Sequence, residues 1–345
     1  MTGSRATLDD VAARAGVSRM TVSNVYGRPD VVAMPTRERV LAAAAELDYG
    51  GPSAVGRTLR RGSTEVLGIL VNVGIPYTFS DPGAALFMRG VAQGADEADL
   101  SLQVVHASGP SARRRVNNTA VDAFIAWSLP ADDPALLAAV ERRLPIVAVG
   151  TASGVPSIPY VSADNFGGGR RAAKHLAELG VRRFALIGGA LVGEQFTDRT
   201  AGWRAGLRAA GIDWSTVLQL EHAGNSRTAG RAAAESFLQV REPGGRWGIL
   251  ASTDVLALGA MHALRLADVD VPNEVAVVGF DDIEESAMST PGLTTVRQDL
   301  FALGRECALR AAGQMHGPTR PHPTSLVVRG STDPNAERPS KEDTT

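Results

Sequence analysis

Residues 7–27 read TLDDVAARAGVSRMTVSNVYG, a stretch that predicts two short helices joined by a tight turn. Thr7 is a good helix cap, because Asp10 can reach back to the free backbone N–H of the capping residue. Gly16 ends the first helix, and Ser18 can cap a second one that runs to about residue 26. Apolar residues recur at helical spacing in both segments, namely Leu8, Val11, Ala12 and Ala15, then Val22 and Val25.

A third helical pattern follows Pro35, a residue that is tolerated in a first turn, and its apolar face is Val40, Ala43, Ala44 and Leu47. Three such helices describe a helix-turn-helix unit, whose second helix lies in the DNA major groove. The exposed positions of that helix would be Arg19, Met20, Ser23 and Asn24. Arginine can hold guanine, asparagine suits adenine, and methionine offers apolar contact. Periodicity alone leaves a plain three-helix cap with solvated polar residues equally open.

The sequence itself favours DNA binding. Residues 7–27, followed by TRERVLAAAAELDY at 36–49, closely resemble the head of the lactose-repressor (LacI/GalR) family, whose pattern begins T-L-x-D-V-A-x-x-A-G-V-S-x-x-T-V-S. The resemblance implies that Arg19, Met20 and Asn24 read bases. It implies phosphate-contacting or framework positions at Thr7, Ser18, Thr21, Ser23 and Tyr49.

Three positions in the head depart from the family pattern. Asn24 stands where many members have arginine, so the operator need not follow the commonest half-site. Gly27 replaces a usual asparagine. Ala33 replaces a serine cap on the third helix, a loss of about 1 kcal/mol.

A linker follows at residues 50–64, GGPSAVGRTLRRGST. In the family this segment forms a hinge helix that folds on operator DNA and inserts a leucine into the minor groove. Ser53, Arg57 and Leu59 match that pattern if one extra residue is allowed after Tyr49. Gly56 occupies a usual alanine position and should cost the helix about 1 kcal/mol. A flexible linker is the alternative.

Charge is distributed unevenly along the chain. Residues 1–62 hold nine arginines and six acidic residues, a net +3, whereas the rest carries 26 basic and 31 acidic side chains, a net −5. A basic head on an acidic body indicates a polyanion partner for the head. The single cysteine, Cys307, excludes an intramolecular disulfide and fits a reducing compartment.

Neither a membrane span nor a secretory signal is predicted. No run of roughly eighteen apolar residues occurs, and the N-terminal residues lack an apolar signal core. We therefore expect a cytoplasmic protein with no membrane partner.

Beyond residue 64, short apolar runs alternate with helical stretches. Candidate strands are Val66–Val71, Leu100–Val105, Ala123–Trp127, Ile146–Val149, Phe184–Ile187, Val217–Leu220, Ile249–Ala251 and Val275–Phe280. Candidate helices are Val91–Ala98, Gly168–Leu179, Gly202–Ala210, Ala229–Val240 and Ala257–Leu266. This alternation predicts parallel sheets covered by helices, with ligands beyond the carboxyl ends of the strands.

Two segments look like crossovers between two lobes of the body. Residues 159–165, PYVSADN, would lead from the first lobe to the second, and residues 291–296, PGLTTV, would lead back. A cleft between lobes connected in this way can close on a ligand by hinge motion.

The family resemblance extends through the body to about Thr332, in VSADNFGGG, KHLAELG, FALIGG, RTAGWRAGLRAAGI, VAVVGFDD and PGLTTVRQD. It implies an α/β fold, a two-lobed periplasmic-binding-protein-like body of parallel sheets behind a small all-α N-terminal helix-turn-helix domain. The expected boundaries are 1–50 for the head, 51–63 for the hinge or linker, 64–332 for the body and 333–345 for a disordered tail. Within the body we expect lobe 1 at about 64–161 and 294–322, and lobe 2 at about 162–293 and 323–332.

The resemblance also implies an effector cleft. The arginine of R-x-x-G and the first aspartate of G-F-D-D project into that cleft in the family, and Arg199 and Asp281 match them. A fork donor and a carboxylate can together hold vicinal hydroxyls. Thr253 stands where the family usually has asparagine, and Gln298 falls at a cleft-lining position. From the residues alone, Asp281 would be assigned as a loop acid.

Two aromatic residues, Phe79 and Trp127, are expected to end the first and third strands on the ligand side. Stacking on a sugar and core packing are equally open for them. Residues 167–169, three glycines, match neither G-x-G-x-x-G nor a P-loop, so no nucleotide cofactor is expected. The six histidines show no ligand spacing, so no metal is expected. No serine elbow, acid pair or cysteine–histidine arrangement indicates an enzyme.

The sequence therefore predicts a transcriptional repressor whose DNA affinity responds to a small molecule. The expected partners are double-stranded DNA with a palindromic operator, a small-molecule effector such as a mono- or disaccharide, and a second copy in a homodimer. A solute-binding protein shares the body and is the first alternative. An α/β sugar-modifying enzyme shares only the strand alternation, and turnover of a sugar by the purified protein would favour it.

Overall fold

The structure is a computed structural model that describes residues 6–51, 62–150, 158–188, 193–220, 224–242 and 244–336. The chain separates into two compact units, Met1–Thr64 and Glu65–Thr345, each with its own apolar core. The predicted hinge residues Ser53, Arg57 and Leu59 lie outside the described residues, as does most of the predicted tail.

The N-terminal unit consists of α1 (Leu8–Ala15), α2 (Arg19–Gly27), the short 3-10 helix η1 (Pro29–Val31) and α3 (Met34–Glu46). Thr7 forms the predicted capping box with Asp10, and Gly16 ends α1 in the left-handed conformation, φ 63°. Ser18 caps α2. The apolar positions predicted from periodicity pack in one core, which includes Val11, Val22 and Val40, all fully buried.

The first lobe of the body contains a five-stranded sheet in the order β2-β1-β3-β4-β5, and neighbouring strands are parallel. Its strands are β1 (Val66–Val71), β2 (Ser101–His106), β3 (Ala123–Trp127), β4 (Ile146–Val149) and β5 (Tyr160–Val161). Its helices are α5 (Ile75–Ser80), α6 (Pro82–Glu97), α7 (Ala112–Asn118) and α8 (Pro134–Glu141). Apolar residues on both faces of this sheet are buried, as expected for a parallel sheet between helical layers.

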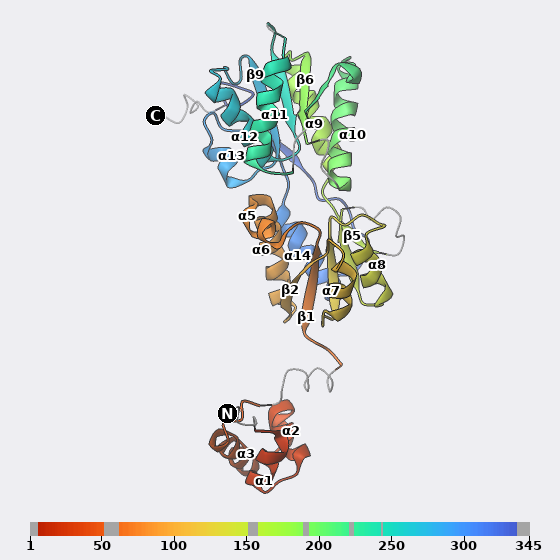
Figure 1. Cartoon of the computed structure of the whole chain (residues 1–345), viewed down its shortest axis with the longest axis vertical. Coiled ribbons are helices and arrows are strands. Elements are labelled where there is room, and N and C mark those ends of the chain that lie inside the picture. Colours follow the sequence, from red (N-terminus) through yellow and green to blue (C-terminus); the bar gives the residue numbers. More distant parts are fainter. Residues whose placement is uncertain are drawn as a thin grey trace. The chain divides into compact units, whose positions relative to one another are not determined.

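The second lobe contains a six-stranded sheet in the order β11-β10-β9-β8-β6-β7, parallel except for β11. Its strands are β6 (Arg183–Ile187), β7 (Leu218–Leu220), β8 (Trp247–Ala251), β9 (Val275–Asp281), β10 (Thr294–Arg297) and β11 (Ser325–Val327). Its helices are α9 (Asn165–Glu178), α10 (Glu194–Ala209), η2 (Trp214–Thr216), α11 (Arg227–Val240), α12 (Asp254–Leu266) and α13 (Glu284–Met288). Figure 1 shows these elements gathered in the green and blue part of the body.

The return to the first lobe comes later in the chain than the sequence indicates. Thr294–Arg297 pairs with β9 as strand β10, so it belongs to the second lobe, whereas the sequence prediction placed residue 294 onward in the first. The chain crosses back immediately afterwards and forms α14 (Leu300–Ala311), which packs against α6 and the first sheet. The first three residues of β10 are buried because the strand lies inside the second sheet, between β9 and β11.

Helices α6 and α14 lie unusually close together. A Cβ atom added at Gly90 of α6 would lie 2.0 Å from the carbonyl oxygen of Phe301, and one at Gly304 of α14 would lie 2.2 Å from that of Phe87. Side chains larger than hydrogen at these two positions would push the helices apart. The glycines therefore fix a backbone-to-backbone contact between two segments that are far apart in sequence.

The predicted strands lie within one or two residues of the observed ones, but several predicted helices begin too late. Helix α6 starts at Pro82, although Pro82-Gly83 resembles a loop sequence, because Asp81 caps it and proline is compatible with a first turn. Helix α10 likewise begins at Glu194, well before the predicted Gly202. No helix among the described residues is long and apolar enough to cross a membrane.

Candidate functional site

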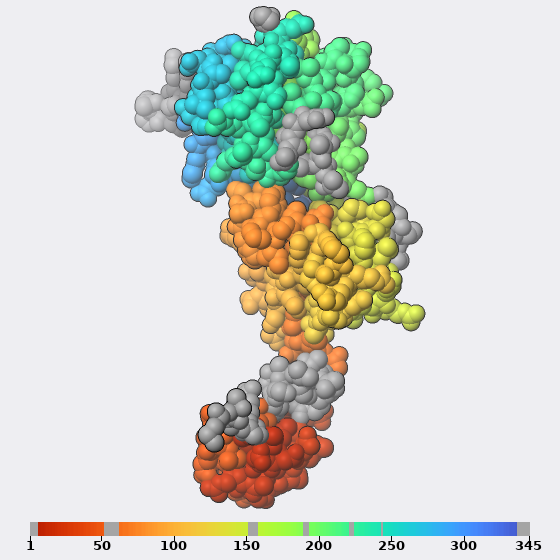
Figure 2. Space-filling view, viewed as in Figure 1, coloured from red at the N-terminus to blue at the C-terminus, as the bar shows by residue number. Residues whose placement is uncertain are grey.

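A cavity lies between the two lobes of the body, at the carboxyl ends of the strands. Its volume is about 120 Å³. Trp127 lines it from the end of β3 and Asp281 from the end of β9. In Figure 2 the two lobes that enclose it form separate masses of atoms that touch.

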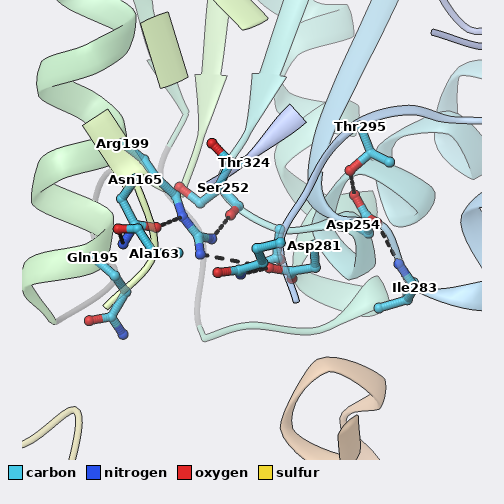
Figure 3. A network of polar contacts seen from close by, with 12 residues as sticks. Ala163, Asn165, Gln195, Arg199, Ser252, Asp254, Asp281, Ile283, Thr295 and Thr324 are labelled. Atoms are coloured by element: carbon cyan, nitrogen blue, oxygen red, sulfur yellow. Dashed lines mark hydrogen bonds and ion pairs between the residues drawn. The ribbon is translucent and has the colours of Figure 1, made fainter. Parts of the chain in front are cut away.

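Arg199 of α10 is the central polar residue of this cavity and is only 3% exposed. Its Nε donates to Asn165 Oδ1 at 2.9 Å, its Nη1 donates to the carbonyl oxygen of Ser252, and its Nη2 lies 3.7 Å from Asp281 Oδ1 (Figure 3). The guanidinium also stacks 3.7 Å from the ring centroid of Phe280. These contacts fix the orientation of the Arg199 guanidinium at one end of the cavity.

Asp281 faces Arg199 in a strained backbone conformation, φ 127°, that side-chain-bearing residues rarely adopt. Gln298 donates to its Oδ1 at 2.6 Å. Burial raises the pKa of Asp281, and the nearby Arg199 only partly offsets this. Burial also lowers the pKa of the Arg199 guanidinium, so desolvation opposes charge on both partners of the pair.

A second buried carboxylate, Asp254, supports the site from behind. It accepts hydrogen bonds from the Ile283 N–H at 3.0 Å, the Ser286 hydroxyl at 2.7 Å and the Thr295 hydroxyl at 2.5 Å. It is not among the residues that line the cavity. Its bonds instead tie the start of α12 to the loop that carries Asp281, which fixes the position of that carboxylate.

The first lobe contributes Tyr77 and Asp81, which the sequence analysis did not identify. Asp81 caps α6 by accepting from the Ala84 N–H at 2.8 Å. Asn225 of the second lobe donates to the Tyr77 hydroxyl at 2.7 Å and to Asp81 Oδ2 at 3.4 Å. Thr253 caps α12 and donates its hydroxyl to Asn225 Oδ1 at 2.5 Å. Thr253 therefore lines the cavity and also holds the Asn225 side chain in place.

The position predicted for Phe79 is wrong. The first strand ends at Val71, and Phe79 lies on α5 with 64% of its surface exposed, outside the residues that line the cavity. Tyr77, on the same helix, points into the cavity instead. The short helix α5 intervenes because the chain turns at Gly74-Ile75-Pro76, and the sequence analysis missed this turn.

Trp127 ends β3 and lines the cavity, as predicted from its position. Its ring also packs on Phe87 of α6, with ring centroids 4.8 Å apart and an angle of 32°. The contact with Phe87 confirms core packing for Trp127, and its ligand contact stays a prediction. Gln195 reaches across from α10 to the Ser128 hydroxyl at 2.9 Å and closes another edge of the cavity.

The missed residues carry weak sequence signals. Tyr77 lies within the short helix α5, Asp81 caps α6, Gln195 lies in the first turn of α10, and Asn225 stands in a polar loop. Asn165 also lines the cavity, and it carried a clearer sequence signal, because it belongs to the VSADN segment that resembles the family pattern. Only the fold brings these positions together.

The head presents its predicted base-reading residues on one surface of α2. Arg19 and Met20 are 69% and 68% exposed, and Asn24 is half-buried one turn further along. Thr7, Ser18 and Thr21 are held by capping hydrogen bonds, including a contact of 2.9 Å between the Ser18 and Thr21 hydroxyls. Ser23 is half-buried beside them. Tyr49 packs edge-on against Tyr26, with ring centroids 6.0 Å apart.

A two-lobed body with a polar cavity, joined to a helix-turn-helix head, defines the class of ligand-responsive transcriptional regulators. Comparisons with known families agree with both parts. Residues 7–51 match bacterial regulatory proteins of the lacI family, and residues 173–332 match the periplasmic binding protein-like domain.

Two relatives cover nearly the whole chain. The HTH-type transcriptional regulator CelR of Thermobifida fusca is 34% identical over 332 residues, 94% of this chain and 96% of its own. An HTH-type transcriptional regulator of Mycolicibacterium smegmatis is 34% identical over 341 residues, 91% of each. The chain therefore belongs to the lacI family of bacterial regulatory proteins and is a DNA-binding transcriptional regulator.

Solved structures show the same architecture. The lac repressor dimer bound to operator and the anti-inducer ONPF has a TM-score of 0.79 at 28% identity, covering 95% of this chain and 99% of its own. The complex of CelR with cellobiose has a TM-score of 0.70 at 32% identity, covering 95% of this chain and all of its own. The solute-binding alternative finds no support in these relatives.

Proposed function

We propose that this regulator is a repressor that binds a palindromic operator as a homodimer. Its affinity for the operator changes when a carbohydrate binds in the inter-lobe cavity. The observation that carries the proposal is the convergence of Arg199, Asp281 and Gln298 with the aromatic rings of Trp127 and Tyr77 in one cavity. Fork donors, amides and carboxylates can pair with hydroxyls, and an aromatic face can cover the apolar side of a sugar ring. The proposal assigns no catalytic step.

In this proposal the DNA contacts come from the head. Arg19, Met20 and Asn24 read bases from α2, while Thr7, Ser18, Thr21, Ser23 and Tyr49 contact phosphates or hold the framework. The linker residues Ser53, Arg57 and Leu59 contact the centre of the operator. The exposure of Arg19 and Met20, at 69% and 68%, supports the base-reading assignment. The protein would act in the cytoplasm, where bacterial DNA lies.

Effector and operator are linked through the angle between the two lobes. The cavity is bridged by residues of both lobes, as in the contacts of Asn225 with Tyr77 and of Gln195 with Ser128. A ligand that changes these bridges changes the angle between the lobes and so the affinity for the operator. By thermodynamic linkage, operator DNA must change the affinity for the ligand by the same factor.

The test begins with selection of bound duplexes from a random DNA pool by the purified protein at near-physiological salt. One enriched palindrome is expected, and it then serves as the probe for fluorescence anisotropy with a panel of sugars. Cellobiose is included because a relative, CelR, has been solved with it. A shift of at least tenfold in operator affinity with one sugar supports the proposal. An enriched operator whose affinity no sugar changes would contradict the carbohydrate part alone.

A further inference from the structure

The charged groups that line the inter-lobe cavity are unbalanced. They comprise one cation, Arg199, and two carboxylates, Asp81 and Asp281. Two further carboxylates act electrostatically from outside the lining, Asp254 on Asp281 and Glu285 on Asp81. Glu285 is paired with Arg227 at 2.8 Å, but Asp254 has only neutral hydrogen-bond donors. Asp281 pairs with Arg199, which leaves Asp81 as the acidic group of the lining that faces no cation.

Arg199 is already engaged in buried contacts. Each of its three nitrogens already has an acceptor, namely the Asn165 side chain, the Ser252 carbonyl and the Asp281 carboxylate. The flat face of its guanidinium rests on Phe280 at 3.7 Å. An anionic ligand would have to compete with Asp281 for the charge of the guanidinium.

Asp81 and Asp281 approach each other from opposite lobes at the first turn of α6. Asp81 Oδ1 and Asp281 Oδ2 lie 3.4 Å and 3.5 Å from the same point, where a Cβ atom of Gly83 would stand. Burial raises the pKa of both carboxyl groups. Asp81 Oδ2 accepts from neutral donors, the Asn225 amide and the Tyr77 hydroxyl, and no ion pair of Asp81 is found among the described residues.

We propose that this cavity selects its effector by charge, admitting a neutral hydroxyl-rich sugar and rejecting phosphorylated or carboxylated sugars, and that Asp81 is the residue that sets this selectivity. The inference rests on the proposed function, in which the cavity binds a sugar. Carboxylate oxygens accept only, so they match the hydroxyl donors of a neutral sugar. A phosphate placed beside the ionised Asp81 is repelled, and the repulsion is strong in a site of low effective dielectric.

The experiment compares sugars that share one ring and differ in charge. For glucose and galactose, the parent sugar, its 2-amino derivative, its 6-phosphate and its 6-carboxylate are titrated into the full-length protein by calorimetry. The expected order of affinity is amino and parent above carboxylate above phosphate, with the phosphate at least about tenfold weaker than its parent. The same order is expected with any larger sugar that the operator screen identifies.

A pair of matched variants assigns the effect to Asp81. Asp81→Asn removes the charge and keeps a side chain that caps helices equally well. Asp133→Asn makes the same change at the cap of α8, outside the cavity. The measured quantity is the ratio of the dissociation constants of phosphate and parent sugar. Asp81→Asn should lower this ratio by about tenfold, and Asp133→Asn should leave it unchanged.

The outcomes separate the two proposals. If the wild-type protein binds a 6-phosphate as tightly as its parent, charge selection is overturned while carbohydrate binding stands. An unchanged ratio in a folded Asp81→Asn protein overturns the assignment to Asp81. If neither the sugars nor their charged derivatives bind, the proposed carbohydrate function itself fails, and charge selection falls with it.

Discussion

The head and the inter-lobe cavity gather their candidate binding residues in opposite ways. Most of the DNA-facing candidates lie in one stretch, residues 7–24, and the base-reading Arg19 and Met20 are largely exposed. The cavity residues come from several strands, helices and loops of two lobes, and Arg199 among them is 3% exposed. A solvated surface tolerates change at single positions, whereas a buried polar site depends on every partner being present.

The largest expected effect is in the cavity. Arg199→Met leaves Asp281, Asn165 and the Ser252 carbonyl without their buried donor, so the body should lose roughly 3–5 kcal/mol of unfolding free energy. All four tryptophans lie in the body, so tryptophan fluorescence during urea unfolding reports on the body alone. Arg204→Met, on the exposed side of the same helix, is the control. Equal losses in both variants would show that the buried contacts do not stabilise the body.

In the head the effect should appear in specificity and not in folding. Arg19→Ala combined with Asn24→Ala removes two base-reading side chains, and each base contact contributes roughly 1–3 kcal/mol of discrimination. Binding to the selected operator should fall to the level of random DNA, while sugar affinity stays the same. Parallel anisotropy and calorimetry on one protein preparation measure both. A similar loss of sugar affinity would argue that the two regions do not bind independently.

An intermediate effect is expected on the pH dependence of the body's unfolding free energy. Burial raises the pKa of Asp281 from 3.8 to about 8, so in this pH range the folded body keeps a proton that the unfolded chain releases. This contribution to stability is full below pH 3.8 and is lost as the pH rises through 8.

Asp281→Asn should therefore flatten the fall of stability with rising pH, by at most about 1.4 kcal/mol per pH unit. Urea unfolding at several pH values measures the slope, and Asp133→Asn is again the control. An unaltered slope would mean that Asp281 titrates near its ordinary pKa.

The smallest effect concerns the cap of α3, where Ala33 provides no side-chain hydrogen bond. Ala33→Ser should stabilise the head by about 1 kcal/mol, because a serine hydroxyl can accept from a free N–H of the first turn. The head contains no tryptophan, so helical circular dichroism of the full chain, resolved into two transitions, is the measurement. If only the body transition moves, the head is not stabilised by its cap.

The sequence predicted the helices and the core of the head almost completely, because capping and helical period are local. The base-reading residues stay a prediction. In the body it predicted the strands, and it identified Arg199, Asp281 and Gln298 through a family pattern. It missed Asp81, Tyr77 and Asn225 because their importance arises only when two lobes bring distant loops together. It misplaced Phe79 and residues 294–297 because short segments without a clear period do not reveal which helix or sheet they will join.

The placement of α14 has a consequence for biosynthesis. The first lobe is nearly complete when residue 161 leaves the ribosome, yet the helix that covers one face of its sheet, with Leu303, Cys307 and Ala308 in the core, is among the last segments to be made. Until then Leu67, Ile69 and their neighbours lack part of their cover, whereas most of the second lobe emerges as one continuous segment. We expect these apolar residues of the nascent chain to be exposed to aggregation for as long as that delay lasts.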